Sequence, residues 1–296
     1  MDYNLPMVLA EKLYKILPSG IIEKLQPKIM SVVSKKTHSV GNRLNYVDIN
    51  VVDHCNLKCK YCANFCPLAN ERYLDIEEYN KDCERLSSLT GGKIKTIRLL
   101  GGEPLLHPRL IEVIDITRKY FPLSEIDLVT NGLLLLKMPD DFWLECKRCG
   151  VKVAISHYPI ELNYGEIKKT AKQFDVKTIY GKKARGMYKW ILDLNGEQDM
   201  KESYSYCFRA NQCTVLQNGK IYSCSLPPWI NYFNDYFDKN LSVCDLDYID
   251  IYKINGFEEI LHFMSKPIPF CKYCNTKIMK YSNKWDISRK EISEWT

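Results

Sequence analysis

The sequence contains no hydrophobic stretch that approaches the roughly 20 residues a membrane-spanning helix requires. Its first residues, Met1-Asp2-Tyr3-Asn4, lack the basic, then apolar, then small-residue order of a secretion signal. The net charge of +6 is mild and is spread along the 296 residues, without the concentrated basic patch that is typical of nucleic-acid-binding proteins. We therefore expect a cytoplasmic protein with no membrane span and no nucleic-acid partner.

Cysteine, by contrast, is abundant, with 13 in the chain. An odd number of cysteines without an export signal argues against a framework of disulfides. Clustered cysteines in a reducing compartment indicate bound metal instead. Histidine is scarce, and we expect His54 and His107, which flank the motifs described below, to have structural roles.

Strand-like and helix-like segments alternate from residue 46 to about residue 180, which predicts βα units on a parallel sheet. About six units are too few to close an eight-stranded barrel, so we predict an α/β fold with an open, partial (β/α)6 barrel. In such folds the chemistry lies at the carboxyl ends of the strands. The predicted strands are Tyr46–Asp53, Thr96–Leu100, Ile126–Val129, Val151–Ser156 and Val176–Tyr180, and the predicted helices are Ile76–Leu89, Arg109–Tyr120, Pro139–Cys149 and Tyr164–Phe174.

The composition changes near residue 200, where aromatic residues, cysteines and prolines become dense. This change predicts a boundary between the barrel and a small cysteine-rich module. The expected divisions are an N-terminal helical extension (1–45), the partial barrel (46–205), the C-terminal module (206–280) and a tail (281–296).

Three cysteines, Cys55, Cys59 and Cys62, form a C-x3-C-x2-C run directly after the first predicted strand. Three thiols in one loop fit a [4Fe–4S] cluster with one open iron, which can bind a second molecule. Zinc is an alternative, but structural zinc prefers paired C-x2-C units. A closed ferredoxin-like site completed by Cys66 is another, although the first gap here is one residue too long for it.

A second motif, Gly101-Gly102-Glu103-Pro104, ends the next predicted strand. Its two glycines expose backbone carbonyl groups at the strand end, and the carboxylate of Glu103 follows them. These acceptors suit an ammonium group, which needs hydrogen-bond acceptors. Together the two motifs resemble those of the radical S-adenosylmethionine (AdoMet) superfamily. The resemblance implies that the cysteines hold the AdoMet-binding cluster and that the Gly-Gly-Glu-Pro motif binds the methionyl amine.

Further AdoMet contacts are implied by the same resemblance. Tyr61 occupies the position where the superfamily carries an aromatic residue beside the adenine of AdoMet. Thr130, Asn131 and Ser156 follow later strands and are implied to be polar contacts to the ribose or carboxylate of AdoMet. Ordinary strand-end turns are the alternative for each of these polar residues. The implied chemistry is reduction of AdoMet by the cluster to methionine and a 5′-deoxyadenosyl radical, which removes a hydrogen atom from a C–H bond. Such an enzyme needs an external electron donor such as flavodoxin or ferredoxin.

The C-terminal third carries a second group of cysteines. The segment 213–224 predicts a β-hairpin that turns at Asn218-Gly219, and Cys271-x2-Cys274 is a knuckle-type pair. Zinc fits this group by chemistry alone, but the layout resembles the "Twitch" and "SPASM" modules, which hold auxiliary [4Fe–4S] clusters. A full SPASM module needs cysteines beyond Cys274, so we expect one auxiliary cluster. The candidate ligands are Cys224, Cys271, Cys274 and either Cys207 or Cys213.

Four other cysteines, Cys83, Cys146, Cys149 and Cys244, are expected to be packing residues or bystanders. The phrases HCNLKCKYC, LLGGEPLLHPRL and PIPFCKYC, among others, resemble a group of Twitch-type radical AdoMet proteins associated with bacterial surface-polysaccharide genes. That resemblance implies a sugar-like substrate, and the cluster Lys182-Lys183-Ala184-Arg185 could bind the phosphates of a nucleotide sugar.

Two outcomes of hydrogen abstraction are compatible with these features. An auxiliary cluster that accepts an electron favours dehydrogenation of an alcohol, whereas a thiol that returns a hydrogen atom favours epimerisation. Cys66 is the candidate thiol, with a buried structural cysteine as its alternative. A radical AdoMet enzyme that modifies a peptide and a non-catalytic iron–sulfur protein for electron transfer or assembly are the competing functions.

Overall fold

The computed structural model describes residues 41–181, 186–282 and 284–296. Residues 1–40 of the predicted N-terminal extension and the Lys182–Arg185 cluster lie outside these ranges. Within the described ranges, every helix is too short or too polar to span a lipid bilayer.

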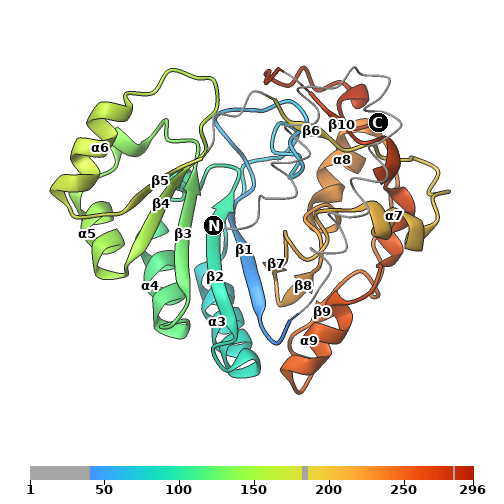
Figure 1. The fold of residues 1–296 in the computed structure, drawn as a ribbon, viewed down its shortest axis with the longest axis horizontal. Coiled ribbons are helices and arrows are strands. Elements are labelled where there is room, and N and C mark those ends of the chain that lie inside the picture. Colours follow the sequence, from blue (N-terminus) through green and yellow to red (C-terminus); the bar gives the residue numbers. More distant parts are fainter. Residues whose placement is uncertain (1–40, 182–185, 283) are drawn as a thin grey trace.

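The structure is an α/β fold built on a mostly parallel, open sheet, which confirms the predicted fold class (Figure 1). The sheet has eight strands in the order β5-β4-β3-β2-β1-β7-β8-β9. Strands β1 to β5 are parallel, and each lies where the sequence predicted a strand. They are β1 (Leu44–Val52), β2 (Ile94–Gly101), β3 (Glu125–Thr130), β4 (Val151–Ile155) and β5 (Thr178–Tyr180).

The four predicted helices are also confirmed, with ends that differ by at most one residue. They are α3 (Ile76–Thr90), α4 (Leu110–Tyr120), α5 (Asp140–Arg148) and α6 (Tyr164–Gln173). Two of them begin at a side-chain cap, because Asp75 accepts a hydrogen bond from Glu78 N and Asn163 accepts one from Glu166 N. Each helix returns the chain to the start of the next parallel strand.

A sixth parallel strand, β7 (Val215–Gln217), pairs with β1 on the side away from β2. It continues into the antiparallel strand β8 (Lys220–Tyr222) through Asn218-Gly219, both in the left-handed region. This confirms the predicted hairpin, since a two-residue turn of this kind requires positive φ at both positions. Strand β9 (Ile249–Asp250) completes the sheet. The hairpin therefore extends the same sheet that carries β1 to β5.

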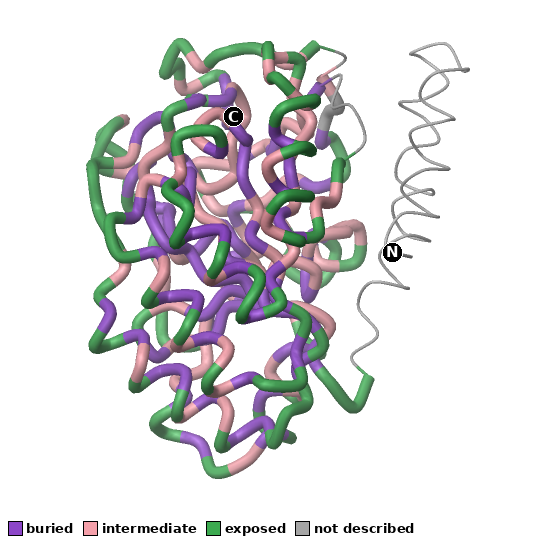
Figure 2. The backbone as a smooth tube through the Cα atoms, turned by 90° about the vertical axis from the view of Figure 1, so that its left-hand side faces the viewer, coloured by how far each residue is buried: buried purple, intermediate pink, exposed green. Residues whose placement is uncertain are grey.

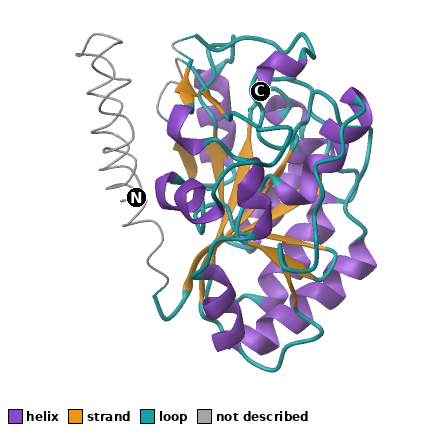
Figure 3. Cartoon of the chain, turned by 90° about the vertical axis from the view of Figure 1, so that its right-hand side faces the viewer, coloured by secondary structure: helices purple, strands orange, loops and turns teal. Residues whose placement is uncertain are grey.

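The remaining elements are short. They are the helices α7 (Met200–Tyr206), α8 (Ile230–Phe237) and α9 (Phe257–Met264), the two-stranded sheet of β6 (Tyr188–Lys189) and β10 (Lys280–Tyr281), and the 3-10 helices Pro104–Leu106, Leu135–Lys137, Pro227–Trp229, Pro269–Tyr273, Thr276–Ile278 and Ile292–Glu294. Figure 3 shows that loops gather around one end of the sheet, near the carboxyl terminus of the chain.

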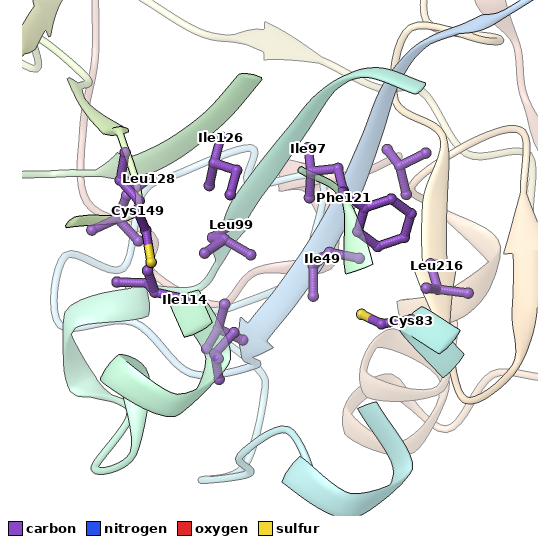
Figure 4. Close-up of a cluster of buried hydrophobic side chains, with 14 of the residues drawn as sticks. Ile49, Cys83, Ile97, Leu99, Ile114, Phe121, Ile126, Leu128, Cys149 and Leu216 are labelled. Atoms are coloured by element: carbon purple, nitrogen blue, oxygen red, sulfur yellow. The ribbon is translucent and has the colours of Figure 1, made fainter. Parts of the chain in front are cut away.

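Alternate residues of the strands build a core between the sheet and α3 to α6. Ile49, Leu99 and Leu128 point into one layer with Cys83 of α3 and Ile114 of α4 (Figure 4). Figure 2 shows that buried residues are concentrated in the middle of the molecule and exposed residues along its outer edges. A second core in the C-terminal part packs around buried aromatic rings. It includes Phe65, Trp229, Phe233, Phe270 and Trp295.

The other face of the central strands is polar. On β1, Asp48 and Asn50 alternate with the core residues, so that they lie on the opposite face. Asp48 forms a bidentate ion pair with Arg98 of β2, with N–O distances of 2.5 and 2.7 Å. Both polar atoms of the buried Asn50 amide are without a hydrogen-bond partner in the described part of the chain.

Candidate active site at the strand ends

The cysteine loop follows directly from β1. Cys59 is buried, whereas Cys55 and Cys62 are partly exposed, and all three thiols are free. The loop bends through left-handed conformations at Lys58 (φ 49°) and Tyr61 (φ 63°), which are uncommon for residues other than glycine. These bends keep the three cysteines within one compact turn at the end of the strand.

Gly101 and Gly102 bring the end of β2 against the start of this loop. Gly102 N donates a hydrogen bond of 2.7 Å to Val52 O, and Glu103 N donates one of 3.1 Å to His54 O. A Cβ atom on Gly102 would lie 1.8 Å from His54 O, and one on Gly101 would lie 2.3 Å from Val52 O. Only glycine permits this approach, so the two glycines fix the position of the loop relative to β2.

Glu103 is fully buried, and its carboxylate ties the end of β2 to the end of β3. It accepts hydrogen bonds from Thr130 Oγ1 (2.6 Å), Asn131 N (2.8 Å) and Leu105 N (3.2 Å). Burial raises the pKa of Glu103 to about 7, and these three donors limit the rise because they favour the charged form. Pro104, also buried, begins the 3-10 helix that follows.

The ends of β3 and β4 complete the arrangement. Asn131 Nδ2 lies 2.7 Å from Asn56 Oδ1 and 3.8 Å from Cys55 Sγ, so that it reaches the cysteine loop. Ser156 is partly buried, and its backbone N donates a hydrogen bond of 2.8 Å to Thr130 O. The structure thus brings the cysteine loop, the Gly-Gly-Glu-Pro turn, Thr130-Asn131 and Ser156 to four successive strand ends.

Tyr61 and Cys66 lie within the same region. Tyr61 is partly exposed, with Lys60 Nζ 5.4 Å from its ring centroid. Cys66 is buried, and its Sγ lies 4.0 Å from Gly101 O. A hydrogen bond between the thiols of Cys66 and Cys62 lowers the pKa of Cys62 and raises that of Cys66, with burial also acting on Cys66. Cys66 is therefore a neighbour of the cysteine loop and of the Gly-Gly-Glu-Pro turn.

The second group of cysteines surrounds a cavity in the C-terminal part of the molecule. Four thiols come from the end of α7, the segment after β8 and the 3-10 helix at 269–273. The cysteines that line the cavity are Cys207, Cys224, Cys271 and Cys274. Cys213, the fifth candidate, is not among the lining residues.

Arg209, which lies beside the second group of cysteines, was not singled out by the sequence. It lines the cavity, and its guanidinium carbon lies 4.7 Å from the centroid of the Trp190 ring. The nearby thiols of Cys213, Cys224 and Cys207 raise the pKa of Arg209 in spite of its burial, and its charge also contributes to the lowered pKa of Cys62. No spacing or periodicity in the sequence marks this arginine, because its position depends on contacts between distant segments.

The cysteines expected to be bystanders have ordinary surroundings. Cys83, Cys146 and Cys149 are buried in the core between sheet and helices, whereas Cys244 is exposed. His107 is also structural, because its ring contacts Leu74 O (3.1 Å) and accepts a hydrogen bond from Arg109 N (3.0 Å).

Comparison with known proteins finds a family similar to the region that carries the three-cysteine loop. Residues 49–157 match the model of the Radical SAM superfamily, in which SAM denotes AdoMet. These residues are similar in sequence to a radical SAM domain. The matched range begins in β1 and ends just after β4, so it contains the cysteine loop and the three other strand ends described above.

Curated relatives are similar over part of their length. The chain is 35% identical over 104 residues to the GTP 3′,8-cyclase of Chlorobaculum tepidum and 36% identical over 112 residues to that of Peptoclostridium acidaminophilum. These regions are 35% and 38% of this chain and 31% and 33% of the relatives. The chain thus spans about a third of the length of the curated relatives it matches.

Solved structures with a similar arrangement have low sequence identity. The crystal structure of BtrN in complex with AdoMet and 2-DOIA is 17% identical, with a TM-score of 0.49, over 78% of this chain and 93% of that chain. The crystal structure of methylornithine synthase (PylB) is 20% identical, with a TM-score of 0.36, over 58% and 53% of the two chains.

The radical SAM domain implies a [4Fe–4S] cluster and AdoMet as cofactors, as the sequence predicted. The donor set fits this pair of ligands. Three free thiols in one loop can hold the cluster, and the buried Glu103 carboxylate lies at the neighbouring strand end.

Replacing Glu103 by glutamine is expected to weaken AdoMet binding by about 1.5–3 kcal/mol, because the variant loses the charge that favours an ammonium group. Iron content should be unchanged, since no cysteine is altered. Calorimetric titration of reconstituted protein with AdoMet under anaerobic conditions measures this effect, with the exposed Glu77→Gln as the control. Equal AdoMet affinity in wild type and Glu103→Gln would show that the carboxylate only organises the turn.

The same variant should also change how the stability of the protein depends on pH. Because the pKa of Glu103 is raised to about 7 in the folded state, the wild-type protein loses stability as the pH rises from about 4.5 through 7. Glutamine does not ionise, so the free energy of unfolding of Glu103→Gln relative to wild type should increase over this range by about 1–3 kcal/mol. Denaturant titrations at pH 5 and pH 8 measure the difference.

Proposed function

We propose that this protein is a radical AdoMet enzyme that abstracts a hydrogen atom from a sugar-like substrate, free or as a nucleotide sugar, and dehydrogenates an alcohol or epimerises a carbon. The observation that supports this most directly is the contact between the three-cysteine loop and the Gly101-Gly102-Glu103 turn. When bound, the cluster supplies an electron that cleaves AdoMet to methionine and a 5′-deoxyadenosyl radical. An external donor such as flavodoxin or ferredoxin provides that electron.

The residues have separate roles in this proposal. The thiols of Cys55, Cys59 and Cys62 hold the cluster and leave one iron open. Glu103 and the backbone of the two glycines hold the ammonium group of AdoMet. The remaining contacts to AdoMet come from Pro104, Tyr61, Thr130, Asn131 and Ser156. The surrounding strand ends orient the bound molecule and limit the access of water.

The four thiols of Cys207, Cys224, Cys271 and Cys274 are proposed to hold an auxiliary [4Fe–4S] cluster. Cys207 is preferred to Cys213 because it lines the cavity with the other three. An auxiliary cluster favours dehydrogenation. A carbinol radical on the substrate would lose one electron to the auxiliary cluster and its hydroxyl proton to the surroundings, which yields a ketone.

A polar substrate suits the inner face of the sheet. Asp48, Asn50 and Arg98 occupy this face, and the unpartnered amide of Asn50 lies five residues before Cys55. The carbohydrate class itself rests on the sequence resemblance to proteins of polysaccharide gene clusters. The similar relatives are GTP 3′,8-cyclases, but the similarity covers only about a third of their length. We therefore do not propose GTP cyclisation for this chain.

Substitution of the two cysteine groups is expected to separate their roles. The Cys55→Ala/Cys59→Ala/Cys62→Ala variant should retain about half of the iron and lose reductive cleavage of AdoMet, because the open iron is lost. Cys207→Ala should lose the other half and retain cleavage of AdoMet. Iron analysis and chromatography of 5′-deoxyadenosine measure these outcomes in anaerobically reconstituted protein.

Cys213→Ala is the matched control, because Cys213 is a partly buried neighbour of the same cavity that does not line it. It should retain the iron of both clusters. Cleavage of AdoMet by the triple variant, or zinc bound at either group with full activity, would contradict the assignment.

The outcome of the radical step is expected to be oxidation. In deuterated water the product should then be a ketone without solvent deuterium at the reacting carbon, and Cys66→Ala should remain active because oxidation needs no thiol. Mass spectrometry of products from candidate nucleotide sugars measures this. Deuterium at an inverted carbon, with loss of activity in Cys66→Ala, would instead establish epimerisation, and 5′-deoxyadenosine formed only with a peptide would refute both.

A further inference from the structure

The segment Asp286–Trp295 contacts the cysteine loop, although the two are more than 220 residues apart in sequence. Lys60 N donates a hydrogen bond of 2.9 Å to Asp286 O, and Ser288 N donates one of 2.9 Å to Lys58 O. Between them, Cys59 and Ile287 form an antiparallel β-bridge. The backbone of the segment therefore pairs with the part of the loop that carries the central cysteine.

Trp295 provides a further contact at the third cysteine. Its indole Nε1 donates a hydrogen bond of 2.9 Å to Cys62 O, and its side chain is fully buried. The ring lies 5.9 Å from the ring of Phe65 and 6.0 Å from that of Phe237, measured between centroids. Leu192 N donates to Trp295 O at 2.7 Å, which anchors the tryptophan to another part of the chain.

The cysteine loop needs such support because its backbone is strained. Lys58, Tyr61 and Phe65 all have positive φ, between 49° and 63°, and none of them is glycine. Residues in such sparsely populated conformations persist only when surrounding contacts determine them. The contacts of the segment fall within this strained stretch, at Lys58, Lys60 and Cys62.

The segment is itself held in shape by a buried carboxylate. Glu294 is 1% exposed, and it accepts hydrogen bonds from Ser288 Oγ (2.6 Å) and Arg289 N (2.7 Å). These bonds close the turn that separates the β-bridge at Ile287 from Trp295. One short segment thus reaches both Cys59 and Cys62.

We propose that Asp286–Trp295 is a positioning element of the active site, and that Trp295 holds the cysteine loop in the conformation that accepts the cluster. This inference rests on the proposed function of the loop as a cluster site. Preorganisation of this kind lowers the cost of ordering a site at the moment of binding. Trp295 touches neither AdoMet nor substrate in this account.

The test compares Trp295→Phe with Trp229→Phe in the full-length reconstituted protein. Phenylalanine keeps an aromatic ring but removes the indole donor. Trp229 is a fitting control because it is also buried in the same core, and its Nε1 has no hydrogen-bond partner among the described residues. The readouts are amide hydrogen exchange of peptides covering 55–66 and of peptides covering 207–224, together with the amplitude of the electron paramagnetic resonance signal that responds to AdoMet.

In Trp295→Phe, exchange in 55–66 should accelerate by about tenfold, since the Cys62 carbonyl loses its indole donor and the loop is held less firmly. Exchange in 207–224 should stay unchanged, and the AdoMet-responsive signal should decrease. Exchange equal to that of Trp229→Phe, or accelerated equally in both regions, would overturn the inference. The proposed function is tested by a different result, because it is refuted if the wild-type protein does not cleave AdoMet.

Discussion

The close backbone contact between Gly101-Gly102 and the segment Val52–His54 is the constraint on which the site depends. It joins the end of β2 to the start of the cysteine loop with hydrogen bonds of 2.7 and 3.1 Å. A side chain at position 102 would collide with backbone rather than with a flexible group, so no rearrangement of side chains could relieve it. The contact sets the distance between the thiols and the carboxylate of Glu103, and therefore what can bind between them.

From this contact the site extends in two directions. Toward β3, hydrogen bonds of Glu103 and Asn131 link the strand end to the loop. Toward the C-terminal part, Arg209 and Trp295 link the loop to the second core and to the four-thiol cavity. A cation beside the four-thiol cavity would raise the reduction potential of a cluster bound there, because net charge and hydrogen bonding set that potential. The two groups of cysteines are thus parts of one connected structure.

The sequence predicted much of this fold because its signals are local. The periodicity of apolar residues located β1 to β5 and α3 to α6, and the Asn218-Gly219 turn located the hairpin. The motifs at Cys55–Cys62 and at Gly101–Pro104 lie at strand ends, so their proximity followed from the rule that parallel strands present their carboxyl ends on one edge.

The features that were missed depend on contacts between distant segments. Pairing of β7 with β1 rests on two residue pairs far apart in sequence, and no pattern within β7 specifies its neighbour. Spacing along the sequence left both Cys207 and Cys213 as candidates for the fourth thiol, and of the two Cys207 lines the cavity. The tail predicted for 281–296 carried no signal that it would pair with the cysteine loop, since backbone hydrogen bonds leave no trace in residue type.

The central claim is that three thiols hold a cluster with one iron open to AdoMet. Mössbauer spectroscopy of protein reconstituted with iron-57 tests it most directly, because the method resolves individual iron sites. AdoMet is expected to change the isomer shift of a single iron site and to leave the other sites unaltered. A spectrum that is identical with and without AdoMet would contradict the claim.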